Sequence, residues 1–330
     1  MILAGDIGGT KTYVGLYRPD PSGAVEVEAA RYASTDFPGV AELLQAFLSE
    51  CGHERPDRVV IGVPGPVRQP PVKPVNLPWT IDPAAIADQL GVAHVDLLND
   101  LEATAYGTLA LGPQDLIQLN AGEPDPNGNA AVIAAGTGLG EAGLAWVGTG
   151  HAAVPSEGGH ASFAPGTGLE AELWDYLFQL HGHVSWERVV SGMGLVNIYE
   201  FLRDTNRGQE PDWLREQLAG SDEGARIISE AATSGHCELA SQALDLFVSL
   251  YGAEAGNLAL KFLATGGVFI GGGIAPKIAD KLCDGTFMAA FAEKGRVSDI
   301  LHRIPVHIIR NDRIGLLGAA YYGARQAEHP

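Results

Sequence analysis

Residues 5–12 read Gly5-Asp6-Ile7-Gly8-Gly9-Thr10-Lys11-Thr12 and directly follow a short apolar run. Glycine lets the backbone turn tightly and bring its N–H groups against an anion, so such a turn after a strand is typical of a phosphate-binding site. The stretch resembles a P-loop, except that Thr10 stands where a P-loop has glycine and that a P-loop opens into a helix. Residues 12–17 are instead β-branched and aromatic, which predicts a second strand and makes the turn part of a β-hairpin.

Two further glycine turns occur later in the chain, again after apolar runs. They are Gly136-Thr137-Gly138-Leu139-Gly140 and Gly271-Gly272-Gly273. Gly138-Leu139-Gly140-Glu141-Ala142-Gly143, which overlaps the first of these, matches a dinucleotide-binding pattern, but residues 143–148 predict a strand where that pattern requires a helix. Three such turns indicate one nucleotide contacted from several sides. The recurrence of strand, glycine turn and strand also indicates a duplicated fold.

The composition limits the class of protein. A chain of 330 residues can bury a large core and commonly forms two domains. With 21 Lys and Arg against 40 Asp and Glu, the formal net charge of −19 argues against nucleic acid or an anionic membrane as a partner. The three cysteines are widely spaced and predict neither a disulfide framework nor a zinc site. The start of the chain does not read as a signal peptide and no apolar stretch has membrane-spanning length, so we expect a cytoplasmic protein.

Strands and helices alternate along the chain, which predicts an α/β fold with sheets covered by helices. Asp82 and Pro83 are suited to cap and begin a helix, and the proline-rich residues 64–78 predict an irregular loop. One amphipathic helix is predicted by Val40, Leu43, Leu44, Phe47 and Leu48. Further strands are predicted at residues 59–63, 95–98, 131–135, 268–270 and 305–309, and helical segments at 101–111, 169–201, 223–263, 274–282 and 315–325.

Asn99 and Asp100 lie where a predicted strand ends and a helix begins. Open α/β sheets place their ligands at this edge. One interpretation is that one of these residues simply caps the helix. The other is that the carboxylate of Asp100 accepts the proton of a substrate hydroxyl that attacks a phosphoryl group. Since phosphoryl transfer mainly requires orientation, a weak base suffices.

Four other polar side chains are candidates for ligand binding. Glu157 and His160 flank two glycines, which suits a loop that hydrogen-bonds a polyhydroxy ligand, although a solvated charge and a structural histidine are the simpler interpretations. Glu187 lies near the start of a helix opened by Ser185, where a favourable dipole contact would explain it without a ligand. Asp6 is either a turn residue or a group that binds magnesium through water.

Taken together, the motifs resemble the bacterial glucokinase family, in order from Gly5 to Lys277. The motifs are Gly5-Asp6-Ile7-Gly8-Gly9-Thr10, Leu98-Asn99-Asp100-Leu101-Glu102-Ala103, Gly136-Thr137-Gly138-Leu139-Gly140, Ser156-Glu157-Gly158-Gly159-His160-Ala161-Ser162-Phe163-Ala164-Pro165, Glu187-Arg188-Val189-Val190-Ser191-Gly192 with Gly194-Leu195-Val196-Asn197-Ile198-Tyr199, and Gly271-Gly272-Gly273-Ile274-Ala275-Pro276-Lys277.

The resemblance implies the two-domain α/β fold of actin, hexokinase and the heat-shock ATPases, which is ribonuclease H-like and has duplicated β-sheet cores covered by helices. We expect a small domain of residues 1–105 plus 310–330 and a large domain of residues 106–309, with the active-site cleft between them. Such enzymes close two domains over ATP and substrate. The zinc-binding cysteine cluster of the related repressor and sugar-kinase group has no counterpart in this sequence.

The resemblance also implies roles for individual residues. Glucose would be held by Asn99, Asp100, Glu157, His160 and Glu187, with Asp100 as the base toward the 6-hydroxyl. The phosphates of Mg-ATP would be surrounded by Asp6, Gly8, Gly9, Thr10, Thr137 and Gly138, and Gly272 and Gly273 would line the nucleotide. Asp6 would bind Mg²⁺ through water. Lys11 stands where the family often has Asn, so we expect at most a phosphate contact from it.

The activity implied by the resemblance is ATP-dependent transfer of the γ-phosphoryl group to the 6-hydroxyl of glucose, giving glucose 6-phosphate at the start of glycolysis. The family also leads us to expect a homodimer. Two alternatives stay open: a kinase for another hexose, such as mannose or fructose, and a non-catalytic sugar-sensing protein of the same fold.

Overall fold

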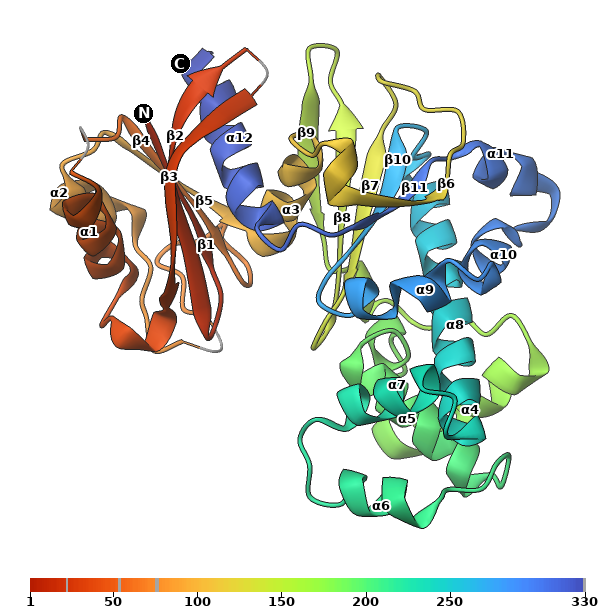
Figure 1. Ribbon diagram of the computed structural model, residues 1–330. Helices are drawn as coiled ribbons and strands as arrows, with labels where there is room; N and C mark the ends of the chain where they lie inside the picture. The colour runs from red at the N-terminus through yellow and green to blue at the C-terminus, as the bar shows by residue number, and fades with distance from the viewer. Residues whose placement is uncertain (22, 53–54, 75–76, 329–330) are drawn as a thin grey trace. The chain divides into compact units, whose positions relative to one another are not determined.

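The computed structural model describes residues 1–21, 23–52, 55–74 and 77–328, and the chain forms two compact units (Figure 1). The first unit comprises Met1–Asp115, His151–Pro155 and Asn311–Pro330, and the second comprises Leu116–Gly150 and Ser156–Arg310. The expected boundary after residue 105 falls inside helix α3 (Asp100–Thr108), which continues through this point. The first unit therefore extends to Asp115.

The first unit is built on a five-stranded sheet. Its strands are β1 (Ile2–Ile7), β2 (Lys11–Asp20), β3 (Gly23–Ala33), β4 (Arg58–Val63) and β5 (His94–Asn99), in the order β3-β2-β1-β4-β5. The hairpin predicted around the first glycine turn is confirmed, because β1 and β2 pair antiparallel with Ile7 opposite Thr12. Strand β3 continues this antiparallel order, whereas β4 and β5 run parallel to β1.

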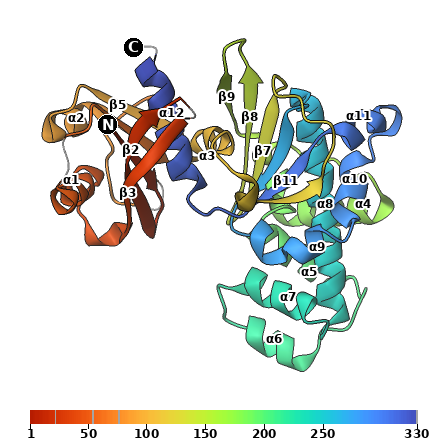
Figure 2. The same ribbon diagram turned by 45° about the horizontal axis from the view of Figure 1, so that its top comes forward.

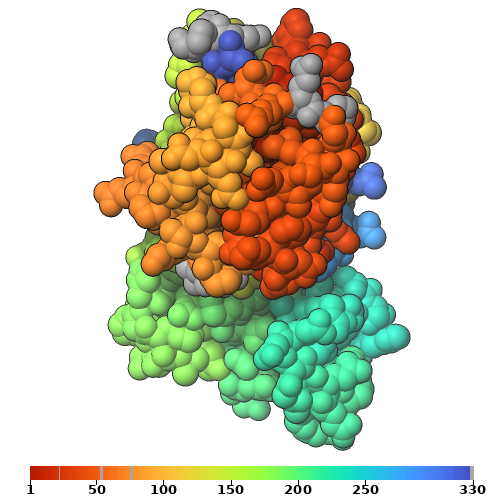
Figure 3. Space-filling view, turned by 90° about the vertical axis from the view of Figure 1, so that its left-hand side faces the viewer, coloured from red at the N-terminus to blue at the C-terminus, as the bar shows by residue number. Residues whose placement is uncertain are grey.

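Helices cover both faces of this sheet. The amphipathic helix predicted around Leu43 is α1 (Val40–Cys51), and it shares a hydrophobic cluster with α2 (Pro83–Leu90) and with Leu3 and Ile61 of the sheet. A second cluster joins the opposite face to α3 and α12 (Ile314–Glu328). Figure 1 shows the sheet between these two layers, and Figure 3 shows the outer surface formed by α1 and α2. The proline-rich segment is irregular as predicted, although residues 75 and 76 lie outside the described residues.

A six-stranded sheet, whose strands belong to the second unit except for His151–Pro155 of β9, repeats the topology of the first sheet. Its strands are β6 (Leu116–Asn120), β7 (Ala130–Ala135), β8 (Leu139–Trp146), β9 (His151–Ser156), β10 (Gly267–Gly271) and β11 (Val306–Ile309), in the order β6-β11-β10-β7-β8-β9. Strands β7 and β8 form an antiparallel hairpin, β10 is parallel to β7, and β11 is parallel to β10. The order β9-β8-β7-β10-β11 thus matches β3-β2-β1-β4-β5, which confirms the predicted duplication. Strand β6 is an antiparallel addition at the edge.

The helices of the second unit surround the long helix α8 (Glu238–Phe262). Helices α5 (Gly192–Asp204), α6 (Asp212–Leu218) and α7 (Gly224–Thr233) lie at one end of this unit, with α5 and α7 against α8 (Figure 2). The remaining helices are α4 (Gly168–His181), α9 (Ala279–Leu282), α10 (Thr286–Ala292) and α11 (Ser298–Arg303). No helix among the described residues is long and apolar enough to span a bilayer.

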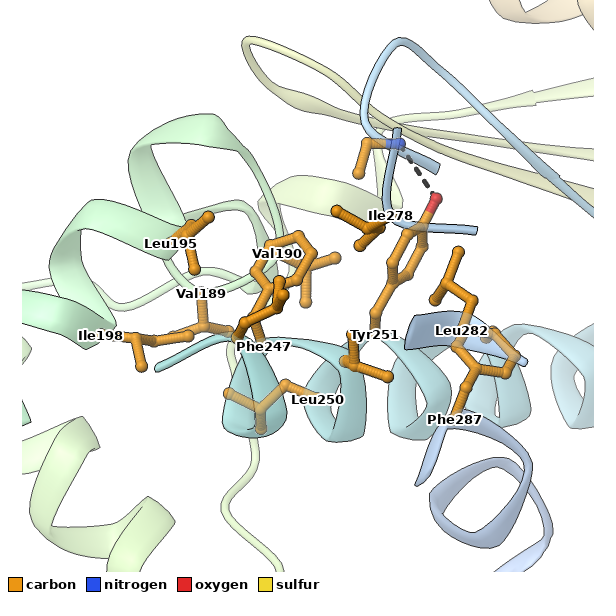
Figure 4. Close-up of a cluster of buried hydrophobic side chains, with 14 of the residues drawn as sticks. Val189, Val190, Leu195, Ile198, Phe247, Leu250, Tyr251, Ile278, Leu282 and Phe287 are labelled. Carbon is orange, nitrogen blue, oxygen red and sulfur yellow. Dashed lines mark hydrogen bonds between the residues drawn. The ribbon is translucent and has the colours of Figure 1, made fainter. Parts of the chain in front are cut away.

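The core around α8 connects this helix to the glycine turns. Phe247 and Tyr251 project from α8 into a cluster of buried apolar side chains (Figure 4). The hydroxyl of Tyr251 accepts a hydrogen bond from the main-chain N–H of Ala135 at 3.2 Å and lies 3.3 Å from the carbonyl oxygen of Gly271. Since Ala135 ends β7 and Gly271 ends β10, one buried side chain contacts the strand ends from which the second and third glycine turns begin.

Candidate active site

The first glycine turn is held by hydrogen bonds to a neighbouring segment. The N–H of Gly8 donates to the carbonyl oxygen of Lys11 at 2.9 Å and closes the turn. The hydroxyl of Ser34 donates to the carbonyl oxygen of Gly8 at 2.7 Å, and its N–H donates to that of Thr10 at 3.2 Å. The side chains of Thr10 and Lys11 are left exposed. The turn is therefore fixed from one side only, and sequence analysis did not identify Ser34 as its support.

Asp6 and Asp100 lie near one another at the strand ends of the first unit. Burial raises the pKa of Asp6 to about 7, and the negative charge of Asp100 contributes to the increase. The start of α12 approaches the same carboxyl group closely, because a Cβ added to Gly315 would lie 2.7 Å from Asp6 Oδ2. Two carboxyl groups at one place provide the oxygen ligands that Mg²⁺ prefers. The residues present thus fit a magnesium ion.

The structure shows which of Asn99 and Asp100 caps helix α3. Asn99 is the N-cap of α3: its Oδ1 accepts from the N–H of Leu101 at 2.9 Å, and its own N–H donates to Glu102 Oε2 at 2.9 Å. Its amide also donates to the carbonyl oxygen of Gly65 at 3.1 Å. Asp100 is the first residue of the helix, and its Oδ1 lies 3.0 Å from the N–H of Leu101. The cap is therefore made by Asn99 with Glu102, as a capping box.

The second glycine turn joins β7 to β8 and leaves Thr137 exposed. The N–H of Gly136 donates to the carbonyl oxygen of Gly138 at 2.8 Å, and the N–H of Gly192, at the start of α5, donates to the carbonyl oxygen of Gly136 at 2.8 Å. Glu187 supports the other side of the turn, because its Oε2 accepts from the N–H of Leu139 at 3.0 Å. A Cβ on Gly138 would lie 2.4 Å from that oxygen, so only glycine fits here without displacing Glu187.

Glu157, His160 and Glu187 come together in the second unit. The Nε2 of His160 lies 3.9 Å from Glu157 Oε2, and its Nδ1 lies 3.9 Å from Glu187 Oε1. The side chains of Glu157 and His160 are 77% and 62% exposed, whereas that of Glu187 is 23% exposed. The segments that carry them are joined by a backbone bond from the N–H of Trp186 to the carbonyl oxygen of Ala161 at 3.0 Å. The histidine is thus placed between two acidic groups, with its side chain open to solvent.

The third glycine turn packs against the second. Gly272 has a φ of +83°, and a Cβ at this position would lie 2.2 Å from the carbonyl oxygen of Ala135. The N–H of Ile274 donates to the same carbonyl oxygen at 3.2 Å. Glycine is required at 272 by both the backbone conformation and the close approach. The turn therefore brings Gly273 close to the start of the second glycine turn.

A cavity of about 990 Å³ lies beside these two turns, entirely within the second unit. Its wall is formed by the second glycine turn, the start of α5, α7 with the segment before it, and the residues after the third glycine turn. Polar members of the wall are Thr137, Ser221, Asp222, Glu223, Arg226, Ser229, Glu230, Thr233 and Lys277. Sequence analysis did not predict a role for α7. The size and mixed lining suit an organic group larger than a phosphate.

The two units thus contribute different groups. The first unit brings together Asp6, the first glycine turn, Asn99 and Asp100. The second brings together the other two turns, the cavity and the cluster of Glu157, His160 and Glu187.

Two sheets of the same topology, each opened by a hairpin with a glycine-rich turn, define an α/β protein of the actin and hexokinase fold. The acidic and histidine side chains beside the second turn suit a polyhydroxy ligand. The chain belongs to the glucokinase family, since the sequence model of that family matches residues 3–326. The predicted family and fold class are both confirmed.

Similar proteins support this assignment over nearly the whole chain. A glucokinase from Nostoc punctiforme is 42% identical over 338 residues, which cover 98% of this chain and 99% of that protein. The crystal structure of a glucokinase from an Antarctic psychrotroph is 33% identical with a TM-score of 0.87, and the match covers 97% of this chain and 98% of that one. A ROK family glucokinase from Streptomyces griseus, solved in complex with glucose and AMPPNP, is 23% identical with a TM-score of 0.63 over 98% of this chain and 99% of that one. The last comparison concerns the fold alone.

Proposed function

We propose that this protein is a glucokinase, which transfers the γ-phosphoryl group of ATP to the 6-hydroxyl of glucose and releases glucose 6-phosphate and ADP. Membership of the glucokinase family supports this activity. The observation that carries the proposal is the bond between Glu187 and Leu139, because it joins a candidate sugar ligand to a candidate phosphate-binding turn. An enzyme that brings a sugar and a phosphoryl donor together needs these groups side by side.

Glucose would be bound by Asn99 and Asp100 from the first unit and by Glu157, His160 and Glu187 from the second. Carboxylates accept hydrogen bonds from hydroxyl groups, and histidine can donate to a hydroxyl oxygen. Beyond its bond to Gly65, the amide of Asn99 has a second N–H that can donate to a sugar hydroxyl, so the cap does not prevent it from binding a sugar. The proposal requires both units to contribute to a single substrate complex.

Asp100 would act as the general base. Its carboxylate accepts the proton of the 6-hydroxyl while that oxygen forms a bond to the γ-phosphorus and the bond to the β-phosphate oxygen breaks. The position of Asp100 as the first residue of α3 fixes its backbone, since the capping box on Asn99 and Glu102 holds the helix start. Orientation of the hydroxyl is then the main contribution of this residue.

The nucleotide would be held by the backbone N–H groups of the three glycine turns. From the first unit, the phosphates would be faced by Gly8, Gly9, Thr10 and Lys11. From the second unit, they would be faced by Thr137 and Gly138. Gly272 and Gly273 would line the nucleotide, and the neighbouring cavity has the size for its base and ribose. Mg²⁺, when bound, would neutralise charge on the phosphate oxygens. Asp6 would hold it through water, with Asp100 as a neighbouring carboxylate.

The biological setting is part of the same proposal. Phosphorylation of glucose would make this protein the first enzyme of glycolysis in the cytoplasm, where ATP is plentiful, and it would act as a homodimer. The glucokinase of Streptomyces griseus binds glucose and an ATP analogue, which suggests the same substrate pair for this protein.

A coupled assay that crosses a panel of hexoses with a panel of phosphoryl donors tests the proposal. We expect turnover with glucose and ATP that exceeds turnover with mannose, fructose, ADP or polyphosphate. Faster phosphorylation of another hexose would assign a different kinase. Glucose binding without any turnover would assign a sugar-sensing protein of the same fold.

A further inference from the structure

Glu141 is a fully buried acidic residue in the middle of β8, with only 1% of its surface exposed. Neither of its carboxyl oxygens has a hydrogen-bond donor among the described residues. An ionised carboxylate in such a place would be strongly destabilising. The charge state of Glu141 is therefore decided by the groups that face it.

Glu254 of α8 faces Glu141 and is completely buried. Its own oxygens are satisfied: Oε1 accepts from Lys261 Nζ at 3.0 Å and Oε2 accepts from Asn257 Nδ2 at 2.8 Å. Glu254 thus forms an ion pair with Lys261. Two carboxyl groups can bind one another only if one of them carries a proton, and burial together with the charge of Glu254 raises the pKa of Glu141 to about 8.

Glu141 directly supports the loop that carries Glu157 and His160. A Cβ on Gly158 would lie 2.0 Å from Glu141 Oε2, and a Cβ on Gly159 would lie 2.1 Å from the carbonyl oxygen of Leu139. The loop therefore lies on β8 at two points, and only glycine permits so close an approach. A change at either point would displace the candidate sugar ligands on both sides of the two glycines.

We propose that Glu141 is a positioning residue for the sugar-binding loop, and that it supports Gly158 as a protonated acid sharing its proton with Glu254. This inference rests on the proposed function, because it assigns the loop to glucose binding. Ionisation of Glu141 would place a second negative charge beside Glu254, and the pair would separate. The loop would then lose its support, and the affinity for glucose would fall.

Several charged or titratable groups surround the pair and set the pH at which this occurs. Lys261 favours ionisation of Glu141, whereas Glu254 opposes it. Lys294 lies near Glu254 and donates to the carbonyl oxygen of Ala253 at 2.8 Å. The other groups near these residues are the hydroxyl of Tyr251 on α8 and Glu170 and Glu293 near Lys294, together with Glu157 and His160 on the loop itself.

The test is the KM for glucose at saturating ATP, measured from about pH 6 to about pH 10 in the wild type and three variants. The wild-type KM should rise by about tenfold per pH unit above the pKa of Glu141, since one proton is lost. Glu141→Gln should keep a constant KM, because its amide reproduces the neutral acid. Lys261→Met should move the rise to higher pH, because it removes the cation that favours ionisation. Glu216→Gln, on the exposed surface of α6, should behave as the wild type.

A rise in KM that is the same in Glu141→Gln as in the wild type would overturn the inference. Amide hydrogen exchange of residues 157–161, corrected for intrinsic rates, provides a readout that does not need turnover. It should increase above pH 8 in the wild type and not in Glu141→Gln. Absence of glucose phosphorylation at every pH would reject the proposed function, while equal exchange in the two proteins would reject the role of Glu141.

Discussion

The carboxylate of Glu187 accepts a hydrogen bond from the main-chain N–H of Leu139 at 3.0 Å, while its other oxygen lies 3.9 Å from Nδ1 of His160. One side chain thus contacts both the second glycine turn and the cluster expected to bind sugar. Binding of the two substrates should therefore be coupled through this residue.

Glu187→Ala should raise the KM for glucose and the KM for ATP together. Loss of a hydrogen bond to a charged group costs about 1.5–3 kcal/mol, which corresponds to about a 10- to 100-fold change in affinity. Glu157→Ala is the matched comparison, because Glu157 is 77% exposed and belongs to the same cluster. It should raise the KM for glucose alone. Equal effects of both variants on the KM for ATP would contradict the coupling.

Asp100→Asn should lower kcat by about 10²- to 10⁴-fold, the usual contribution of a general base. The KM for glucose should change little, because the amide keeps the shape of the side chain. Asp88→Asn, an exposed position on α2 of the same unit, serves as the control and should keep the parent kcat. Steady-state kinetics with both variants checks this prediction. Turnover of Asp100→Asn within tenfold of the wild type, a limit of about 1.4 kcal/mol, would remove the assignment.

Magnesium should be required for turnover. Chelation of divalent cations should abolish glucose phosphorylation, and added Mg²⁺ should restore it, because the phosphate charges need a cation beside Asp6. Asp6→Asn should increase the Mg²⁺ concentration for half-maximal activity by about tenfold, because the variant loses one charge-assisted hydrogen bond to the hydrated ion. A titration of activity against free Mg²⁺ measures both effects. Full activity in the presence of the chelator would show that turnover does not need a Mg²⁺ site at Asp6.

Gly272 and Gly273 should respond differently to alanine. Gly272→Ala combines a φ of +83° with a contact of 2.2 Å to Ala135, so the thermal unfolding temperature should fall. The backbone strain alone is worth about 1–3 kcal/mol. Gly273→Ala adds a Cβ with no atom of the described residues within 4 Å and should keep the parent unfolding temperature while raising the KM for ATP. A stable Gly273→Ala protein with unchanged KM would show that this glycine does not line the nucleotide.

The free energy of unfolding should depend on pH through Glu141. Its pKa is raised from 4.5 to about 8 in the folded protein, so the folded state binds this proton more tightly than the unfolded chain does. The stabilisation is complete below pH 4.5 and is lost as the pH rises to about 8. The unfolding temperature of Glu141→Gln minus that of the wild type should increase across this window and then level off. A constant difference, as expected for Glu216→Gln, would argue against a raised pKa.

Local patterns predicted the parts of the fold that depend on neighbouring residues. The first hairpin follows from the β-branched residues after the glycine turn, and Asp82 caps α2 with Pro83 at its start, as expected. Strands β3, β6 and β9 were not predicted. Strand β3 has polar or exposed side chains at most positions, and β6 is short and lies at a sheet edge, so neither has a clear apolar pattern.

The candidate site was predictable where motifs are contiguous and not where contacts join distant segments. Asn99, Asp100, Glu157, His160 and Glu187 were recognised from their motifs. Ser34 supports the first glycine turn although it lies 26 residues from Gly8 in the sequence. Gly315 contacts Asp6 from about 300 residues away. The order of residues alone gives no signal of either contact. The same is true of Glu141 and Glu254, which meet only because α8 packs on the sheet.

The two copies of the sheet differ most in the chain that links the third strand of each repeat, β3 or β9, to the next strand, β4 or β10. Among the residues that the structure describes, the link between β3 and β4 holds one α-helix, α1, whereas the link between β9 and β10 holds α4 to α8. Glu157, His160, Glu187 and α7 all lie within the longer link, which runs from Ser156 to Gly267. The candidate sugar ligands of the second unit and most of the wall of the cavity are therefore carried by one inserted segment, whereas Asn99 and Asp100 belong to the repeated part of the fold.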